Sequence, residues 1–185
     1  MITFPDVHTL YCQDPLADYP DVVALSKVRL VVFDFDGVFT DNSVYVDQNG
    51  SESVRCSRLD GFGLAALRYI GVVSFVLSTE KNSVVSARCK KLQIDCYSGI
   101  DDKGLFLSAH LKQVGIPPEN VAYAGNDIND IDCLTMVGFP IIVADSHPSV
   151  FRFARYITKS PGGHGAVREI CDFIVAATER TKLIS

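Results

Sequence analysis

Several features are missing from this chain of 185 residues, and each absence narrows its class. No apolar run is long enough to cross a membrane, and the first residues lack the basic start and apolar core of a signal peptide. We therefore expect a cytoplasmic protein with no membrane partner. The net charge of −5 provides no general positive field, which argues against nucleic acid as a partner. The sequence also has no internal repeat and no low-complexity tract.

The six cysteines include no Cys-x-x-Cys pair, so we expect free thiols that fill the core rather than zinc ligands or disulfides. Hydrophobic residues make up 48% of the chain and charged residues 21%, as in an ordinary globular protein of one domain. Residues 1–27 carry three prolines and little periodicity, which indicates an irregular N-terminal extension. The domain itself is expected over residues 28–185.

From residue 28 onward, apolar runs of strand length alternate with segments of helical spacing. We expect strands over 28–33, 72–77, 94–97, 121–124, 140–143 and 156–157. Helices are expected over 64–70, 84–92, 105–111, 128–137, 148–155 and 166–178. An Asn-Gly turn between 44–46 and 53–55 predicts a β-hairpin. This order predicts an α/β fold, a three-layer Rossmann-like parallel sheet with helices on both faces.

The first strand ends in two carboxylates, Asp34 and Asp36, followed by glycine. Side chains two positions apart leave a strand on the same side, so both acids can point at one place. Two buried like charges need a cation or a proton, and clustered carboxylates suit a hard cation such as Mg²⁺. A plain turn that closes the strand would explain Asp36-Gly37 but not Asp34.

Polar residues also follow two other strands. Ser78 and Thr79 come after 72–77, and a third group begins at Asn126. Because ligands bind beyond the carboxyl ends of parallel strands, we expect these segments to meet at one edge of the sheet. Together with Lys103, they could carry phosphoryl transfer, in which a carboxylate attacks and cations balance the phosphate charge.

The order of these motifs resembles that of the haloacid dehalogenase superfamily phosphatases over roughly residues 28–175. The signature Asp-x-Asp-Gly-Val-x-Thr stands at residues 34–40, and motifs two and three match Ser78 and Lys103. Motif four, usually Gly-Asp-Asp-x-x-Asp, stands as Gly-Asn-Asp-Ile-Asn-Asp at residues 125–130.

This resemblance implies that Asp34 is the nucleophile and Asp36 the general acid and base, with Ser78 and Lys103 completing the catalytic set. It also implies Mg²⁺ bound by Asp34, by the main-chain carbonyl of Asp36 and by motif four. Asn126 replaces the usual metal-binding aspartate, so Asp127 or Asp130 is a further candidate ligand. The same replacement leaves open an alternative, a catalytically weak scaffold that supports a cytidylyltransferase partner.

The intervals between motifs are too short for a cap domain. Only a hairpin and one helix fit between Asp36 and Ser78, and the interval from Lys103 to Gly125 is shorter. An uncapped site needs another cover for a small substrate, and a neighbouring subunit that docks through the 44–54 hairpin would supply it.

Residues 162–169 resemble the C-terminal motif of one uncapped subfamily. It contains 3-deoxy-D-manno-octulosonate 8-phosphate (KDO 8-phosphate) phosphatases, nonulosonate 9-phosphate phosphatases and modules fused to acylneuraminate cytidylyltransferases. The resemblance implies a homotetramer whose substrate is a sugar acid phosphate contacted by Arg168. Without it, Gly-Gly-His-Gly would be a flexible loop and Arg168 part of a solvated helix face.

The remaining substrate contacts are expected from Thr40 and from Thr79, Glu80 and Lys81 after motif two. In this subfamily the octulosonate branch usually has Gly-Arg-Lys after motif two, and the nine-carbon branch has Gly-Glu-Lys. Glu80 therefore favours a nine-carbon substrate, whereas Thr79 matches neither branch.

Overall fold

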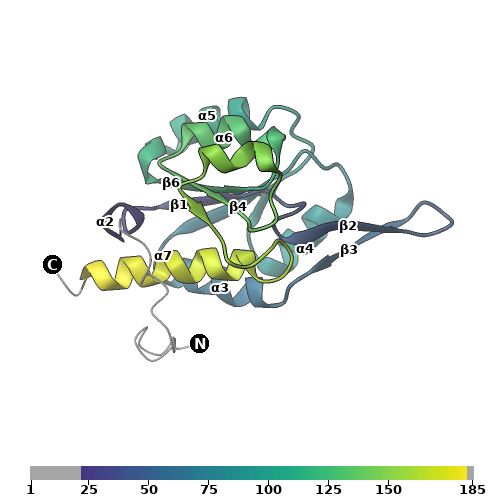
Figure 1. Cartoon of the computed structure of the whole chain (residues 1–185), viewed down its shortest axis with the longest axis horizontal. Helices are drawn as coiled ribbons and strands as arrows, with labels where there is room; N and C mark the ends of the chain where they lie inside the picture. Colours follow the sequence, from purple (N-terminus) through teal and green to yellow (C-terminus); the bar gives the residue numbers. More distant parts are fainter. Residues whose placement is uncertain (1–21, 183–185) are drawn as a thin grey trace.

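The computed structural model describes residues 22–182, and within them the expected α/β fold is confirmed. Six parallel strands form one sheet in the order β5-β4-β1-β6-β7-β8 (Figure 1). Their bounds are β1 Leu30–Phe33, β4 Val73–Leu77, β5 Asp95–Tyr97, β6 Val121–Gly125, β7 Phe139–Ile142 and β8 Tyr156–Ile157.

Helices cover both faces of this sheet, which makes three layers (Figure 1). On one side lie α2 Val22–Leu25, α3 Leu59–Tyr69, α4 Ser83–Leu92 and α7 Ala166–Lys182; on the other lie α5 Lys103–Val114 and α6 Ile131–Met136.

The central strand β1 is apolar at every position. Val31 and Phe33 join the core cluster under α3 and α7, whereas Leu30 and Val32 join the cluster under α5. Because successive side chains point to opposite faces, a strand covered on both faces must be apolar at every position. The end of this run is therefore where a polar residue first becomes tolerable.

The predicted hairpin is present as β2 Thr40–Val46 and β3 Glu52–Cys56, and it projects away from the sheet (Figure 1). Its outer part carries three exposed apolar side chains, Val44, Tyr45 and Val46. At its base Thr40 pairs with Cys56, so β2 begins beside the loop that follows β1. The hairpin thus grows out of the same edge as the Asp34 segment.

Two expected helices differ in kind from the prediction. The 128–137 segment is a 3-10 turn, Ile128–Asp130, followed by the short α6, and the 148–155 segment is a 3-10 helix at Pro148–Phe153. The first difference has a local cause: Asp130 Oδ2 accepts hydrogen bonds from the N–H groups of Asn126 and Asp127, which tightens the turn. A further 3-10 turn, Pro118–Asn120, precedes β6.

Most of the predicted extension, residues 1–21, lies outside the described residues. In its described part, α2 places Leu25 in the core cluster that α7 also joins. In the described part of the chain all five cysteines are free, and Cys89, Cys133 and Cys171 are buried, as expected of core thiols. No helix between residues 22 and 182 combines the length and apolar character needed to cross a membrane.

Candidate active site

Asp34 lies directly after β1, at the carboxyl edge of the sheet and almost fully buried. Its backbone N–H still donates to Ala124 O of β6 at 2.8 Å, so the sheet fixes the main chain here. Its side-chain Oδ1 accepts a hydrogen bond from the N–H of Phe35 at 2.7 Å. Both contacts hold the carboxylate in one orientation.

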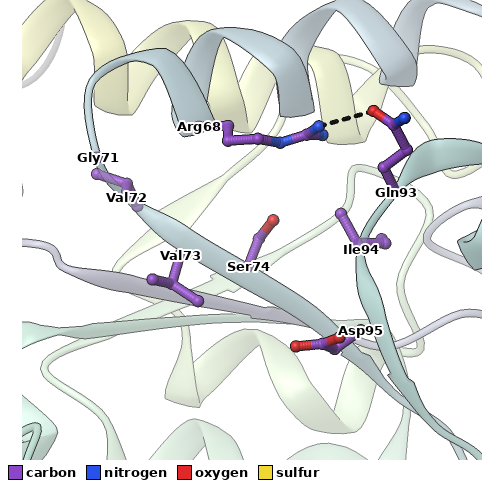
Figure 2. Close-up of a pocket in the computed structure, with 8 residues that line it drawn as sticks. All are labelled: Arg68, Gly71, Val72, Val73, Ser74, Gln93, Ile94 and Asp95. Carbon is purple, nitrogen blue, oxygen red and sulfur yellow. Dashed lines mark hydrogen bonds between the residues drawn. The ribbon is translucent and has the colours of Figure 1, made fainter.

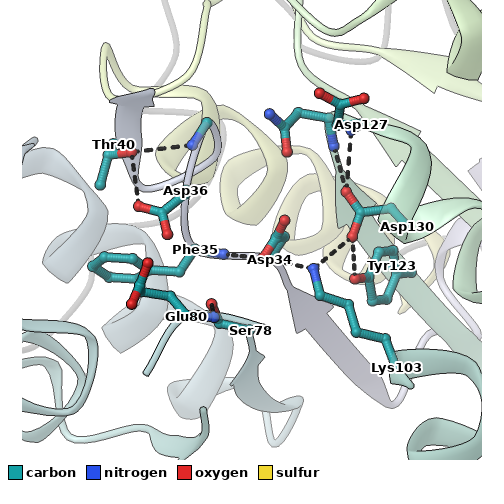
Figure 3. Close-up of polar contacts among 12 residues, drawn as sticks. Asp34, Phe35, Asp36, Thr40, Ser78, Glu80, Lys103, Tyr123, Asp127 and Asp130 are labelled. Carbon is teal, nitrogen blue, oxygen red and sulfur yellow. Dashed lines mark hydrogen bonds and ion pairs between the residues drawn. The ribbon is translucent and has the colours of Figure 1, made fainter. Parts of the chain in front are cut away.

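Lys103, the first residue of α5, joins the first and fourth motifs (Figure 3). Its Nζ lies 2.8 Å from Asp34 Oδ1 and 2.9 Å from Asp130 Oδ1, and all three side chains are buried. The helix that positions it is capped by Asp102, whose side chain accepts from the N–H of Leu105. One buried ammonium thus neutralises two carboxylates from distant segments.

Asp130 uses all of its remaining hydrogen-bonding capacity. Tyr123 donates its hydroxyl to Asp130 Oδ1 at 2.6 Å, and Asn126 N donates to Oδ2 at 2.8 Å. Asp127 N donates to the same Oδ2 at 3.2 Å (Figure 3). Because its carboxylate is enclosed, Asp130 supports Lys103 and is not placed as a direct metal ligand, in contrast to one of the two expectations for motif four.

These surroundings shift three pKa values. Burial, followed by repulsion from Asp130, raises the pKa of Asp34 from 3.8 to about 7, although Lys103 opposes the rise. Burial lowers the pKa of Lys103, but Asp34 and Asp130 outweigh it, so that its pKa is raised and the ammonium stays charged. Burial, with Asp130 as the next cause, also raises the pKa of Tyr123, which keeps its hydroxyl a donor.

Asp36 lies on the more open side of the site. The Thr40 hydroxyl lies 3.5 Å from Asp36 Oδ1 and accepts a hydrogen bond from the Gly37 N–H at 3.0 Å (Figure 3). Burial, then repulsion from Glu80, raises the pKa of Asp36. A partly exposed carboxylate with a raised pKa has the properties of a proton donor and acceptor.

Ser78 directly follows β4, and its side chain is buried. Its Oγ accepts from Glu80 N at 3.0 Å, and its own N–H donates to Tyr97 O of β5 at 2.9 Å. The next residues turn outward: Glu80 Oε1 accepts from the N–H groups of Lys81 and Asn82. Glu80 lies on the Asp36 side of the site, because its charge contributes to the raised pKa of Asp36.

The remaining predicted ligands of motif four differ in placement. The Asn126 side chain lies against Gly37, where a Cβ atom would come within 2.0 Å of Asn126 Nδ2. Gly37 also has a positive φ of 77°, so both space and backbone conformation require glycine there. Asp127 is half exposed and accepts from the Ile128 N–H at 2.7 Å.

These groups fit a magnesium ion held by few protein ligands. The available donors are oxygens, namely the Asp34 carboxylate, the Asp36 main chain and Asn126 or Asp127. Buried Asp34, whose pKa is raised, needs positive charge to stay ionised near neutral pH. Within residues 22–182 no three acidic, His or Cys side chains are grouped as a complete cage. Mg²⁺ keeps several waters and substrate oxygens, so it does not need such a cage.

The Gly-Gly-His-Gly segment packs against the loop that follows β1. A Cβ on Gly162 would lie 2.0 Å from Gly37 O, and Gly163 N donates to Val38 O at 3.1 Å. His164 links this segment to the hairpin, since its Nε2 lies 2.9 Å from Arg55 Nη1. The segment is therefore a packed part of the site region and not the loose loop that composition alone would indicate.

Two predicted substrate contacts are directed elsewhere in this chain. Arg168, on α7, pairs with Asp172 of the same helix at 2.7 Å. Lys81 is exposed and lies 3.9 Å from Asp101. Thr79 is half buried between Ser78 and Glu80. The structure thus brings together Asp34, Asp36, Thr40, Ser78 and Glu80 with Lys103 and motif four, but does not direct Arg168 or Lys81 to them.

Sequence reasoning missed Tyr123 as a member of the site. It is a fully buried residue of β6, and its hydroxyl contacts Asp130. A tyrosine hydroxyl inside a continuous apolar strand needs a buried hydrogen-bond partner. The tyrosine in the apolar run of β6 is therefore the sequence signal that could have identified Tyr123.

A shallow groove of about 270 Å³ lies at the opposite edge of the sheet (Figure 2). Val73 and Asp95 line it at the amino ends of β4 and β5. There Arg68 Nη1 donates to Gln93 Oε1 at 3.0 Å. This groove is therefore separate from the carboxyl edge that holds Asp34.

Comparison with known proteins gives consistent results. Residues 76–170 match the model of the haloacid dehalogenase-like hydrolases. The chain is 36% identical over 168 residues to 3-deoxy-D-manno-octulosonate 8-phosphate phosphatase KdsC of Escherichia coli strain K12, covering 90% of this chain and 88% of that protein.

Solved structures agree in fold. A putative hydrolase of this family from Streptomyces avermitilis is 47% identical, with a TM-score of 0.80 over 82% of this chain and 87% of that one. The KDO 8-phosphate phosphatase of Moraxella catarrhalis, determined with magnesium, phosphate and KDO, is 30% identical, with a TM-score of 0.82 over 88% of this chain and 94% of that one. By sequence, by fold and by the four motifs at its sheet edge, the chain belongs to the haloacid dehalogenase-like hydrolases.

Proposed function

We propose that this protein is a Mg²⁺-dependent phosphatase that hydrolyses 3-deoxy-D-manno-octulosonate 8-phosphate. One observation carries the proposal: Lys103 bridges Asp34 and Asp130 at 2.8 and 2.9 Å, beside Asp36 and Ser78, at the carboxyl edge of a parallel sheet. That arrangement suits phosphoryl transfer, and relatives at 36% identity are named as phosphatases of this substrate.

In this proposal Asp34 attacks phosphorus with a carboxylate oxygen. The P–O bond to the sugar breaks as the bond to Asp34 forms, and Asp36 gives its proton to the departing sugar oxygen. Asp36, now ionised, then takes a proton from water that attacks the phosphorus of the aspartyl phosphate. This step breaks the bond between phosphorus and Asp34, so that inorganic phosphate leaves and Asp34 is free again, and the proton taken from water restores Asp36.

Ser78 and Lys103 hold the transferred phosphoryl group, since a hydroxyl and an ammonium can bind its oxygens and balance their charge. The Asp34 carboxylate, the Asp36 carbonyl and Asn126 or Asp127 would hold Mg²⁺. When bound, this ion neutralises the phosphate oxygens that would otherwise repel Asp34. Asp130 supports Lys103 from behind.

A nine-carbon sugar acid 9-phosphate is a second candidate substrate, and Glu80 favours it. The Glu80 carboxylate lies near Asp36 and raises its pKa. A carboxylate there can accept a hydrogen bond from a sugar hydroxyl but would repel a second anionic group of the substrate. Thr40 and Thr79 are further proposed contacts from this chain.

We propose that the protein is a cytoplasmic homotetramer. The uncapped site and the exposed hairpin support the assembly. We propose that the apolar tip formed by Val44, Tyr45 and Val46 meets neighbouring subunits, because such side chains are otherwise costly to expose. Arg168 and Lys81 would then act across that interface. The catalytic domain would comprise residues 28–185, with 1–27 as its extension.

The comparisons do not favour the scaffold alternative that Asn126 raised. Its amide oxygen can coordinate Mg²⁺, and Asp34, Asp36, Ser78 and Lys103 are all in place.

The test is phosphate release from KDO 8-phosphate and from a nine-carbon 9-phosphate, with Mg²⁺ and with EDTA. We expect turnover only with Mg²⁺, and a higher kcat/KM for the eight-carbon substrate. A higher kcat/KM for the nine-carbon compound would make that compound the substrate. Failure to release phosphate from either compound would refute the proposed phosphatase activity.

A further inference from the structure

A buried acid, Asp60, and a half-buried base, Arg88, lie outside the motifs. Asp60 stands in the first turn of α3 and is 1% exposed, and Arg88 lies on α4. Asp60 Oδ2 and Arg88 Nε are both buried, and neither makes a hydrogen bond with the described residues. Such atoms are rare in folded proteins, because they have given up water without replacement.

Burial raises the pKa of Asp60 to about 7, and the positive charge of Arg88 opposes this rise. The two side chains therefore interact as charges without a direct hydrogen bond. An arrangement that is poor for stability points to a role in activity, since strained or unsatisfied groups concentrate at functional sites.

A chain of contacts leads from this pair to the candidate acid and base. Arg88 Nη2 donates to Ser57 O at 2.6 Å. Ser57 follows Cys56, the residue paired with Thr40 at the base of the hairpin. The Thr40 hydroxyl lies 3.5 Å from Asp36 Oδ1.

A second tie fixes the same two elements. Asn82, the N-cap of α4, donates from Nδ2 to Glu52 Oε2 of β3 at 3.0 Å. Helix α4 is therefore tied to β3 at its N-terminus and to the residue after β3 through Arg88 near its middle, and only the tie through Arg88 involves a charged side chain with a buried atom. Its position depends on whatever balances that charge.

We propose that Asp60 is a positioning residue, which holds Arg88 on the Ser57 carbonyl and thereby sets Thr40 and Asp36 for proton transfer. The proposal rests on the proposed role of Asp36. It predicts that the charge of Asp60 matters for turnover more than for stability.

The test compares Asp60→Asn with the wild type at about pH 8, where Asp60 is ionised because its pKa is about 7, using p-nitrophenyl phosphate with Mg²⁺. We expect kcat to fall by about 5–10-fold with KM within about twofold, because geometry at Asp36 changes and phosphate binding does not. The melting temperature should be equal or higher. Asp95→Asn, at the opposite edge of the sheet, is the matched control and should leave kcat unchanged.

The same substitution in an Arg88→Met background identifies the route. Since Asp60 acts through Arg88, Asp60→Asn should change kcat by less than about twofold there. If Arg88→Met does not fold, Arg88→Gln provides the background, because it removes the charge and the guanidinium but keeps a polar side chain.

Undiminished kcat in Asp60→Asn, or an equal loss in both backgrounds, would overturn the positioning role while leaving the phosphatase intact. A kcat loss accompanied by a lower melting temperature would make Asp60 a structural residue and also overturn it. A wild type that releases no phosphate would instead refute the proposed function, and the positioning role with it.

Discussion

The two buried acid–base groups of this molecule are built in opposite ways. In the first, Lys103 contacts Asp34 and Asp130 directly, and Tyr123 and two backbone N–H groups satisfy the rest of Asp130. In the second, Asp60 and Arg88 each retain a buried atom with no hydrogen bond among the described residues.

This difference separates two uses of buried charge. A satisfied network holds its own geometry, so removing the cation that its two carboxylates share should damage stability and activity together. An unsatisfied pair costs stability when both groups are charged, so its removal should lower activity without lowering stability. Substitutions in each group should therefore have different effects on stability and on activity.

The largest effect is expected from Asp34→Asn. We expect kcat to fall at least ~10³-fold, because the amide cannot attack phosphorus. The unfolding free energy should change by no more than about 1 kcal/mol, since Asn still accepts from Phe35 N and Lys103 retains Asp130. Phosphate release and urea unfolding measure the two effects, and substantial remaining turnover would exclude Asp34 as the nucleophile.

Lys103→Met should damage both properties. It leaves Asp34 and Asp130 buried without their shared cation, so we expect a loss of about 3–5 kcal/mol in unfolding free energy. The kcat should fall at least ~10²-fold. Lys112→Met, exposed on the same helix, is the control for urea unfolding. A stable Lys103→Met protein would contradict the satisfied-network view.

The pH dependence of stability should reveal Asp60. Its pKa is raised from 3.8 to about 7, so the folded protein keeps a proton that the unfolded chain releases. The stability contributed by Asp60 is complete below pH 3.8 and is lost as pH rises through 7. Relative to Asp60→Asn, the wild type should lose roughly 2–4 kcal/mol across that interval. Urea unfolding at several pH values tests this, and a constant difference would contradict it.

Tyr123→Phe should have the smallest effect. It removes one hydrogen bond to Asp130, so we expect a loss of about 1–2 kcal/mol in stability. The kcat should fall less than about fivefold, because Lys103 still holds Asp34. Tyr45→Phe, on the exposed part of the hairpin, is the thermal-unfolding control. A large loss of kcat would show that Tyr123 acts on the reaction itself.

The alternating pattern was enough to predict the sheet, the hairpin and the place of Asp34. Continuous apolar strands that end in polar residues have only one arrangement that covers both faces and gathers those ends. The pattern could not predict the 3-10 turn at Ile128–Asp130, because it depends on where the Asp130 carboxylate points. For the same reason the sequence could not distinguish a metal ligand from a support for Lys103.

The sequence left a site role and a surface role equally open for Asp60 after the hairpin, and it could not predict the buried atoms of Asp60 and Arg88. Asp60 precedes glycine at the start of a helix, and Arg88 lies in a helix with other basic residues, so both resemble ordinary surface positions. Their burial arises only when the hairpin base and α4 meet in three dimensions.

The contact between Gly162 and Gly37 also has a consequence for how the protein is made. The loop after β1 leaves the ribosome well before the glycine-rich segment and α7 that cover it, because they lie more than 100 residues further along the chain. Contacts so distant along the chain form late in folding. We therefore expect nascent chains that end before residue 162 to be inactive, even with all four motifs present.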